Sequence, residues 1–414
     1  MLPVATVDGK GASFVDAFFT STSALCVTGL IVQDTPVYFS RFGHVVILVL
    51  IQLGGLGIMT SYAFLSIALG KRFLLSQQAT MKGVLDTESG EVIKTVLFII
   101  VSTFVIEAIG AAVLAVHWSE EPFDDYIFSS VFHSISAYCN AGFSLFSNSL
   151  INYQGDAVVN LTIGTLIVCG GLGFIVLSNL FNYFSFFPGR DKKIHLHTRI
   201  VLTMTGLLII VGAILFYVFE CKNALDQFSV SNRVCVSFFQ SITTRTAGFA
   251  TVDICSLTPS TTLFFIFFMF IGGSSGSTAG GIKTSTFFII IAVVYNTFRG
   301  REEVELFERT IHRRVVQKSF SIATLAFVTI ATFCLILLYT ERASFHAIIF
   351  EAFSAFGTVG LSTGLSADLT VTGKYLIMIL MFVGRIGPLN LALVFGKEIA
   401  GRKIHYPEER LIVG

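Results

Sequence analysis

Four short segments of the sequence each place a glycine ten residues after a phenylalanine. The segments read "FTSTSALCVTG" from Phe19, "FHSISAYCNAG" from Phe132, "FFQSITTRTAG" from Phe238 and "FEAFSAFGTVG" from Phe350. The four glycines, Gly29, Gly142, Gly248 and Gly360, are spaced 113, 106 and 112 residues apart. Phenylalanine fills 43 of 414 positions, so three further matches in one column arise by chance with a probability of roughly 0.001, and we interpret the segments as internal repeats.

The residues of these segments could bind a cation. A cation that leaves water needs oxygens in place of its hydration shell, and rings of backbone carbonyls supply them without buried negative charge. Glycine permits the φ values that turn successive carbonyls inward. None of the candidates is acidic, which argues against a carboxylate ring of the calcium type. The predicted ion-binding residues are Val27, Thr28, Gly29, Asn140, Ala141, Gly142, Thr246, Ala247, Gly248, Thr358, Val359 and Gly360.

Arg245 is the one charge near these glycines, three residues before Gly248. A cationic side chain in a cation path would be costly, so we expect Arg245 to be held in the surrounding protein. The seven cysteines have no CxxC or histidine spacing and are expected to be free thiols.

A second feature is the stretch "GGSSGSTAGGIKTS" from Gly272 to Ser285, which interrupts very apolar sequence on both sides. It could be a phosphate-binding loop, a linker, or irregular backbone inside a membrane. The phosphate loop GxxxxGK[ST] fails by one residue, because Ile282 stands where the lysine should follow Gly281. Irregular backbone at membrane depth must be buried in protein or face water.

Composition predicts an all-α integral membrane protein. Hydrophobic residues make up 54% and charged residues 13%, against about 45–50% and 25% in soluble domains. The net charge of +1 gives no indication of nucleic acid binding. Seven long helices are expected from the apolar runs, and residues 126–155 are too rich in serine and asparagine to face lipid, so a short buried helix and loop are expected there. The seven runs are 42–70, 95–119, 157–189, 200–219, 254–282, 319–340 and 375–396.

The distribution of lysine and arginine predicts the orientation. Segments 70–94, 187–199, 299–318 and 397–414 hold 18 of them, and the alternate segments hold 7. The first set, with the C-terminus, should face the cytoplasm, and the glycine segments should face outward. With no Arg-rich presequence, a multi-pass protein of a bacterial cell (inner) membrane is expected.

Each glycine segment is followed by a span with a small-residue cluster: "QLGGLGI", "VCGGLGF", "FIGGSSG" and "FVGRIGP". We therefore predict four pseudo-repeated units around a central pore, each with an outer helix, a short re-entrant pore helix, a filter loop and an inner helix. The predicted units are residues 1–70, 71–190, 191–300 and 301–414. The inner helix should be interrupted in the third unit and continuous through its glycine pair in the other three.

The first unit departs from this pattern. Only "MLPVATVDGKGAS", with Asp8 and Lys10, precedes its pore helix, and thirteen such residues cannot span a membrane. The outer helix of this unit is thus missing. Either Met1 lies at the end of that helix in a longer version, which we favour, or the chain is naturally short.

The interrupted inner helix lies about 25 residues after Gly248 and is the predicted gate. Arg385, eleven residues into the last span, is a costly intramembrane charge. It could be a positive residue beside the pore that pairs with the interrupted segment, or it could form an ion pair with Glu107. The predicted gating residues are Gly272, Gly273, Ser274, Ser275, Gly276, Ser277, Thr278, Ala279, Gly280, Gly281, Lys283 and Arg385.

In combination, several motifs resemble the ion-translocating subunits of the Ktr and Trk potassium transporters (HKT superfamily), above all the KtrB type. They are "TSALCVTGL", "SAYCNAGFSL", "TTRTAGF", "GTVGLSTG", "GGSSGSTAGGIKTSTF", "MFVGRIGP" and "YPEERLIVG", and they cover essentially the whole chain. The resemblance implies one filter glycine per unit, potassium as the ion, and often sodium-dependent symport. It also implies a homodimer on a cytosolic ring of nucleotide-binding (RCK-type) subunits, with no covalently bound cofactor. This family usually has a proline where Ser275 stands, so this gate is expected to be more flexible.

Two other functions remain as alternatives. A secondary transporter of another small cation or solute also uses broken helices, but four similar loops rather than two inverted halves argue against it. An intramembrane hydrolase would need serine beside histidine or aspartate at membrane depth, and no such pair recurs. The sequence therefore predicts potassium uptake rather than an enzyme, with a filter near the outside and a gate near mid-membrane.

Overall fold

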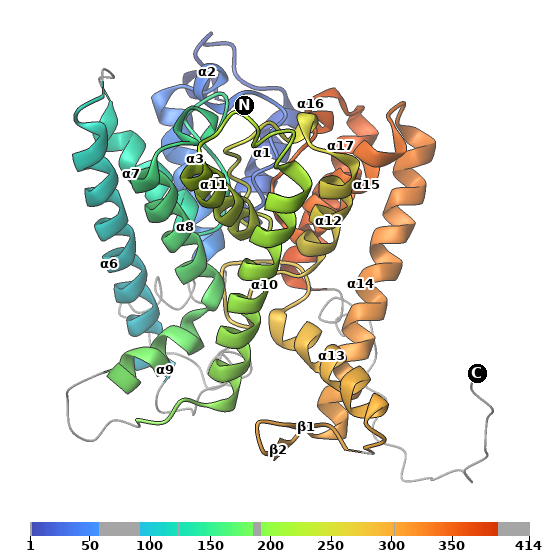
Figure 1. The fold of residues 1–414 in the computed structure, drawn as a ribbon. Helices are drawn as coiled ribbons and strands as arrows, with labels where there is room; N and C mark the ends of the chain where they lie inside the picture. Colours follow the sequence, from blue (N-terminus) through green and yellow to red (C-terminus); the bar gives the residue numbers. More distant parts are fainter. Residues whose placement is uncertain (1, 58–91, 122–124, 185–191, 302, 388–414) are drawn as a thin grey trace.

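The computed structural model describes residues 2–57, 92–121, 125–184, 192–301 and 303–387, and the described chain is mostly helical (Figure 1). One two-stranded antiparallel hairpin, between α13 and α14, departs from the all-α expectation. The elements are η1 (Pro3–Ala5), α1 (Phe14–Leu25), α2 (Thr35–Tyr38), α3 (Arg41–Leu56), α6 (Val92–Trp118), α7 (Tyr126–Tyr138), η2 (Ile151–Tyr153), α8 (Ala157–Leu172), α9 (Phe174–Phe184), α10 (Leu196–Glu220), α11 (Val230–Thr243), η3 (Ile254–Ser256), α12 (Pro259–Phe270), α13 (Thr284–Phe298), β1 (Glu305–Leu306), β2 (Arg309–Thr310), α14 (Arg313–Thr340), α15 (Phe345–Gly357), α16 (Leu365–Asp368) and α17 (Val371–Ile386).

Three described helices, α6, α10 and α14, are long and apolar enough to cross a membrane: Lys94–Trp118, Leu196–Glu220 and Arg313–Thr340. They match the predicted spans 95–119, 200–219 and 319–340. In Figure 1, α6 and α14 lie on opposite sides of the view and α10 runs down its centre. Their outer faces carry exposed apolar side chains such as Ile109, Ile214 and Leu335, as lipid contact requires.

The predicted continuity of the other inner helices is wrong within the described residues. The run 157–189 is broken at Gly173, and its halves α8 and α9 are bent by 101°. Helices α3 and α17 end at Leu56 and Ile386, directly before Gly57 and Gly387. These three glycines have φ of 81–90°, which an α-helix cannot contain. The remainders of runs 42–70 and 375–396 lie outside the described residues.

Four short helices, α1, α7, α11 and α15, carry the predicted filter segments at their C-terminal ends. A serine at the N-cap of α1, α11 and α15 accepts a hydrogen bond from the backbone N–H three residues later and so fixes where each helix begins. Phe19, Phe132 and Phe350 are fully buried, whereas Phe238 is 41% exposed and Phe239 is buried in its place. The third helix is therefore offset by one residue relative to its glycine.

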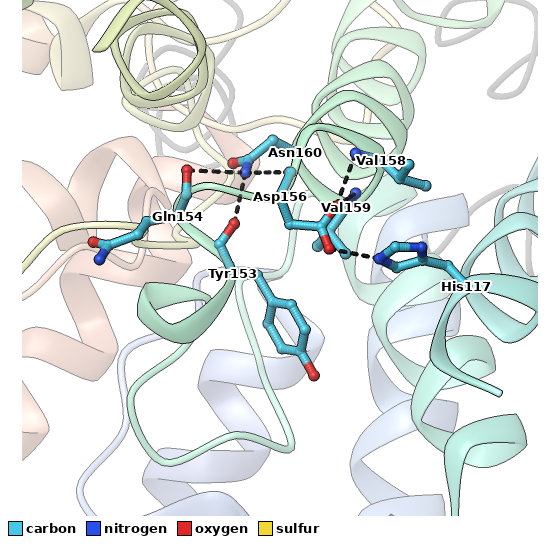
Figure 2. Close-up of polar contacts among 7 residues, drawn as sticks. All are labelled: His117, Tyr153, Gln154, Asp156, Val158, Val159 and Asn160. Carbon is cyan, nitrogen blue, oxygen red and sulfur yellow. Dashed lines mark hydrogen bonds and ion pairs between the residues drawn. The ribbon is translucent and has the colours of Figure 1, made fainter. Parts of the chain in front are cut away.

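At its C-terminal end, each long helix is tied to the start of a shorter helix, α8, α12 or α17. Figure 2 shows this contact for α6 and α8. Asp156 caps α8 by accepting from the N–H groups of Val158 (2.9 Å) and Val159 (3.1 Å), and its other oxygen lies 2.5 Å from His117 Nε2 on α6. Asn160 Nδ2 adds bonds to the carbonyls of Tyr153 and Asp156 at 2.7 and 2.6 Å.

The other two long helices use a glutamate for the same purpose. Glu220 of α10 accepts from Thr258 N–H (2.9 Å) and hydroxyl (2.8 Å) at the start of α12. Glu341, directly after α14, accepts from Thr370 N–H (3.0 Å) and hydroxyl (2.6 Å) at the start of α17. These buried contacts fix the start of α12 against the end of α10 and the start of α17 against the end of α14. All seven cysteines are free, as expected.

Candidate functional site

The structure brings the four predicted filter glycines together in a closed ring. A Cβ atom built on each glycine would collide with the carbonyl oxygen of the residue that precedes the next glycine, and the fourth contact returns to the first segment. The four distances are 2.4 Å from Gly29 to Ala141 O, 2.7 Å from Gly142 to Ala247 O, 2.5 Å from Gly248 to Val359 O and 2.1 Å from Gly360 to Thr28 O. Each position therefore excludes any side chain.

The backbone of the four segments has the same unusual conformation. The residue two positions before each glycine has a positive φ, 56° at Val27, 59° at Asn140, 73° at Thr246 and 50° at Thr358, and each glycine has φ of 69–90°. Positive φ is rare for β-branched residues and costs of order 1–3 kcal/mol each. Such strain persists only where the surroundings impose it, and it clusters at functional sites.

Hydroxyl groups on the short helices form hydrogen bonds with the backbone of these glycine segments. Ser23 and Ser354 accept the N–H of the glycine six residues later, each at 3.1 Å. Ser136 donates to the Phe143 carbonyl at 2.8 Å, and Thr243 donates to the Phe249 carbonyl at 2.6 Å. The sequence analysis missed these residues, although a serine six positions before three of the four glycines was a visible signal.

Arg245 is held in the surrounding protein, as expected. Its side chain is 7% exposed and lines a small cavity with Ile167 and Gly171 of α8 and with Thr205 of α10. The guanidinium thus lies among the helices packed around α11.

The predicted gating segment is a folded loop between α12 and α13. Its neck is closed by a parallel bridge between Ile271 and Ile282. The N–H of Gly272 donates to Ile282 O at 2.8 Å, and the N–H of Thr284 donates to Gly273 O at 3.0 Å. In Figure 1 this loop lies near mid-height in the centre of the molecule. Because its own backbone groups are paired, it can exist as irregular structure at this depth.

The same loop binds the broken end of α8. The N–H of Ser274 donates to the Gly171 carbonyl at 3.0 Å, and the N–H of Phe174 donates to the Gly276 carbonyl at 3.1 Å. Ser274 Oγ also donates to the Leu172 carbonyl. The break at Gly173 therefore leaves the helix-end carbonyls satisfied by the loop.

The loop also forms hydrogen bonds with the fourth glycine segment and with the end of α7, which leads into the second one. The N–H of Gly280 donates to Thr358 Oγ1 at 3.1 Å, and Thr278 Oγ1 donates to the Tyr138 carbonyl at 3.4 Å. A Cβ atom on Gly280 would lie 2.3 Å from Thr358 Oγ1, so a larger residue does not fit there.

Arg385 connects this loop to two inner helices. From α17 it donates through Nη1 to the Thr278 carbonyl and through Nη2 to the Gly54 carbonyl of α3. Lys283 Nζ donates to the Ala279 carbonyl at 2.6 Å. The alternative pairing of Arg385 with Glu107 is wrong, because the buried Glu107 carboxylate instead accepts from Cys139 Sγ at 3.8 Å.

Chemically, a ring of strained backbone carbonyls can replace the hydration shell of a cation. Among the described residues, no group of three histidine, cysteine, aspartate or glutamate side chains could hold a metal ion. Lys283 and Arg385 meet the loop at Ala279 and Thr278, and none of the twelve predicted ion-binding residues carries an acidic side chain.

Comparison with known proteins gives the family. The structure resembles the crystal structure of the potassium transporter TrkH from Vibrio parahaemolyticus, with a TM-score of 0.73 and 19% identity over 94% of this chain and 80% of that one. The sequence is 39% identical to Ktr system potassium uptake protein B of Vibrio alginolyticus, over all of this chain and 90% of that protein. It is 38% identical to the potassium/sodium uptake protein NtpJ of Enterococcus hirae, over all of this chain and 92% of that protein. The family description "TrkH: Cation transport protein" matches residues 2–405, and the chain therefore belongs to this family of membrane cation transporters.

Proposed function

We propose that this chain is the translocating subunit of a potassium uptake system of the Ktr/Trk type in the cell membrane. The observation that carries the proposal is the closed ring of Gly29, Gly142, Gly248 and Gly360. The names of the relatives, potassium uptake protein B and potassium/sodium uptake protein, favour potassium as the ion. We assign one pore unit to each glycine, with the boundaries 1–70, 71–190, 191–300 and 301–414.

In this proposal the carbonyls of the twelve predicted residues, Val27–Gly29, Asn140–Gly142, Thr246–Gly248 and Thr358–Gly360, form the selectivity filter. None of them carries a charge, so discrimination rests on the number, spacing and field of carbonyl dipoles. The hydroxyl bonds from Ser23, Ser136, Thr243 and Ser354 support this reading, because they fix the backbone that presents the oxygens.

The loop Gly272–Gly281, with Lys283 and Arg385, is the proposed gate below the filter. Its contacts with neighbouring helices are hydrogen bonds from single side chains and backbone groups, which water in an open pore can replace. Arg385 holds the loop in place through Thr278 while also binding Gly54. Opening then requires the loop to leave Arg385 and the end of α8 together.

The remaining assignments follow the family resemblance. We propose a homodimer in the bilayer, carried on a cytosolic ring of nucleotide-binding subunits, with the C-terminus in the cytoplasm. The cytoplasmic side is supported by the 18 lysine and arginine residues of segments 70–94, 187–199, 299–318 and 397–414. Sodium is the candidate coupling ion, because one relative is named for both ions.

The test is expression in bacteria that lack their own potassium uptake systems. We expect growth at low potassium and uptake of radioactive rubidium that potassium suppresses and that sodium in the medium increases. Co-expression with a nucleotide-binding partner subunit should raise the rate. Purified protein in liposomes that passes potassium no better than sodium, or that moves an organic solute instead, would refute the proposal in favour of a secondary transporter.

A further inference from the structure

We propose that Glu351 is a positioning residue that fixes the outer end of the fourth filter segment and thereby sets ion discrimination. The inference rests on the proposed filter. Glu351 lies on α15, nine residues before Gly360, and its side chain is fully buried. No role in the proposed carbonyl filter or gate requires a buried carboxylate here, so its presence needs a separate explanation.

The carboxylate binds the chain that immediately follows Gly360. Ser362 Oγ donates to both carboxylate oxygens, at 2.9 and 3.0 Å. Ser366 Oγ donates to Oε1. Two hydroxyl donors from a five-residue segment thus converge on one side chain.

These contacts complete a clamp on the filter segment. On the inner side of the glycine, the Val359 N–H donates to the Ser354 carbonyl at 2.8 Å, and the Gly360 N–H donates to Ser354 Oγ. On the outer side, Glu351 holds Ser362. Both ends of the segment are therefore tied to one helix, so Gly360 cannot move away from Thr28 unless one tie breaks.

The same position is used in α7, by a different side chain. His133, nine residues before Gly142, is fully buried and lies 3.0 Å from Ser144 Oγ. Ser144 follows its glycine by two residues, as Ser362 follows Gly360. Because the Leu145 N–H also donates to His133 Nε2 at 3.4 Å, this nitrogen acts as an acceptor, like the carboxylate. In both segments a buried acceptor on the short helix, Glu351 or His133, thus binds the serine that stands two residues after the glycine.

The chemistry at Glu351 is specific to a carboxylate. Both hydroxyl groups donate to the carboxylate, and among the described residues no cation forms an ion pair with it. Glutamine keeps the shape but loses the negative charge and leaves one acceptor oxygen where the carboxylate has two. Aspartate keeps the charge but is one carbon shorter. Charge-assisted bonds of this kind are about twice as strong as neutral ones, so glutamine should loosen the clamp more than aspartate.

The experiment compares Glu351→Gln and Glu351→Asp with a matched control, Glu341→Gln. Glu341 is also a buried carboxylate that accepts two bonds from a threonine, but that threonine is Thr370, the N-cap residue of α17. Each variant is reconstituted in liposomes, where the potassium-over-sodium preference, the maximal rate and the thermal unfolding temperature are measured. Gly360→Ala serves as the reference for a disrupted filter.

We expect Glu351→Gln to lower the potassium preference roughly tenfold, the effect of about 1.4 kcal/mol, with Glu351→Asp in between. Glu341→Gln should lower the unfolding temperature and leave the preference unchanged. If Gly360→Ala alters the preference and Glu351→Gln does not, the inference about Glu351 is wrong while the filter stands. If neither alters it, the proposed filter itself fails. If Glu351→Gln does not fold, Ser362→Ala, which removes one donor, should shift the preference in the same direction, and an unchanged preference there would overturn the inference.

Discussion

Substitution of Gly360 by alanine tests the ring most directly. The new Cβ atom would lie 2.1 Å from the Thr28 carbonyl oxygen and 3.0 Å from Gly29 Cα. Ordinary contact begins at 3.4 Å, so the oxygen would have to retreat by the difference between 3.4 and 2.1 Å, or about 1.3 Å. Binding groups must hold their geometry to within about 0.5 Å, so we expect the potassium-over-sodium preference to fall at least roughly tenfold.

The matched control is Gly364→Ala, four residues further along the same segment. Gly364 also has a positive φ, 84°, but a Cβ atom there meets nothing within 4 Å. Both variants thus carry the backbone strain of about 1–2 kcal/mol for an L-residue in this region, and only Gly360→Ala adds the collision. Both should lower the unfolding temperature, and only Gly360→Ala should change the preference.

The assay is rubidium uptake into liposomes or deficient cells, with potassium and sodium as competitors. A Gly360→Ala protein that folds and keeps the wild-type preference would show that the ring does not discriminate between ions. Equal losses of preference in both variants would mean that backbone strain, and not the contact with Thr28, is responsible.

Three further predictions concern the gate, the packing and the orientation. Arg385→Met removes the hydrogen bond to Thr278 of the gating loop and the bond to Gly54 of α3, so the uptake rate should rise by roughly tenfold or more with the preference unchanged. An unchanged rate would contradict the gate. The Asp16–Lys374 ion pair joins α1 to α17 at 2.8 Å with side chains only 14% and 15% exposed, and thermal unfolding of Asp16→Asn, Lys374→Met and the double variant should give a coupling energy of about 1 kcal/mol. Partial burial and the Asp253 carboxylate raise the pKa of the exposed Cys255 thiol above its usual value near 9. Because only the thiolate reacts, labelling of intact cells by an impermeant maleimide should rise about tenfold per pH unit through neutral pH. Labelling that occurs only after cell lysis would place Cys255 in the cytoplasm and contradict the proposed membrane orientation.

Much of the site could be predicted from the sequence because the repeated segments share residue types at fixed spacings. A glycine recurs every 106–113 residues, each time ten residues after a phenylalanine, and marks a position where a side chain is excluded. The short distances from Gly29 and Gly360 to neighbouring carbonyl oxygens give the reason. The polar stretch from Gly272 was recognisable for a similar reason, since apolar helices flank it on both sides.

The parts that could not be predicted depend on conformation or on contacts between distant segments. "GGLGF" reads equally well as a packed helix or as a break, and only the positive φ of Gly173 decides between them. The contact from Arg385 to Gly54 joins α17 to α3, across 331 residues, and no local pattern encodes it. The one-residue offset that buries Phe239 in place of Phe238 could not be seen either, because both residues are phenylalanine and the sequence repeat matches Phe238.

The circular order of the glycine contacts means that the four segments are not independent of one another. The Cβ position of each glycine is taken by the carbonyl oxygen that precedes the next glycine, so a substitution in one segment also displaces its neighbour. Farther from the ring the contacts differ, because α6 is anchored through His117 and the end of α14 through Glu341. The ring therefore constrains all four segments jointly, whereas a substitution in one of the surrounding anchors affects one helix.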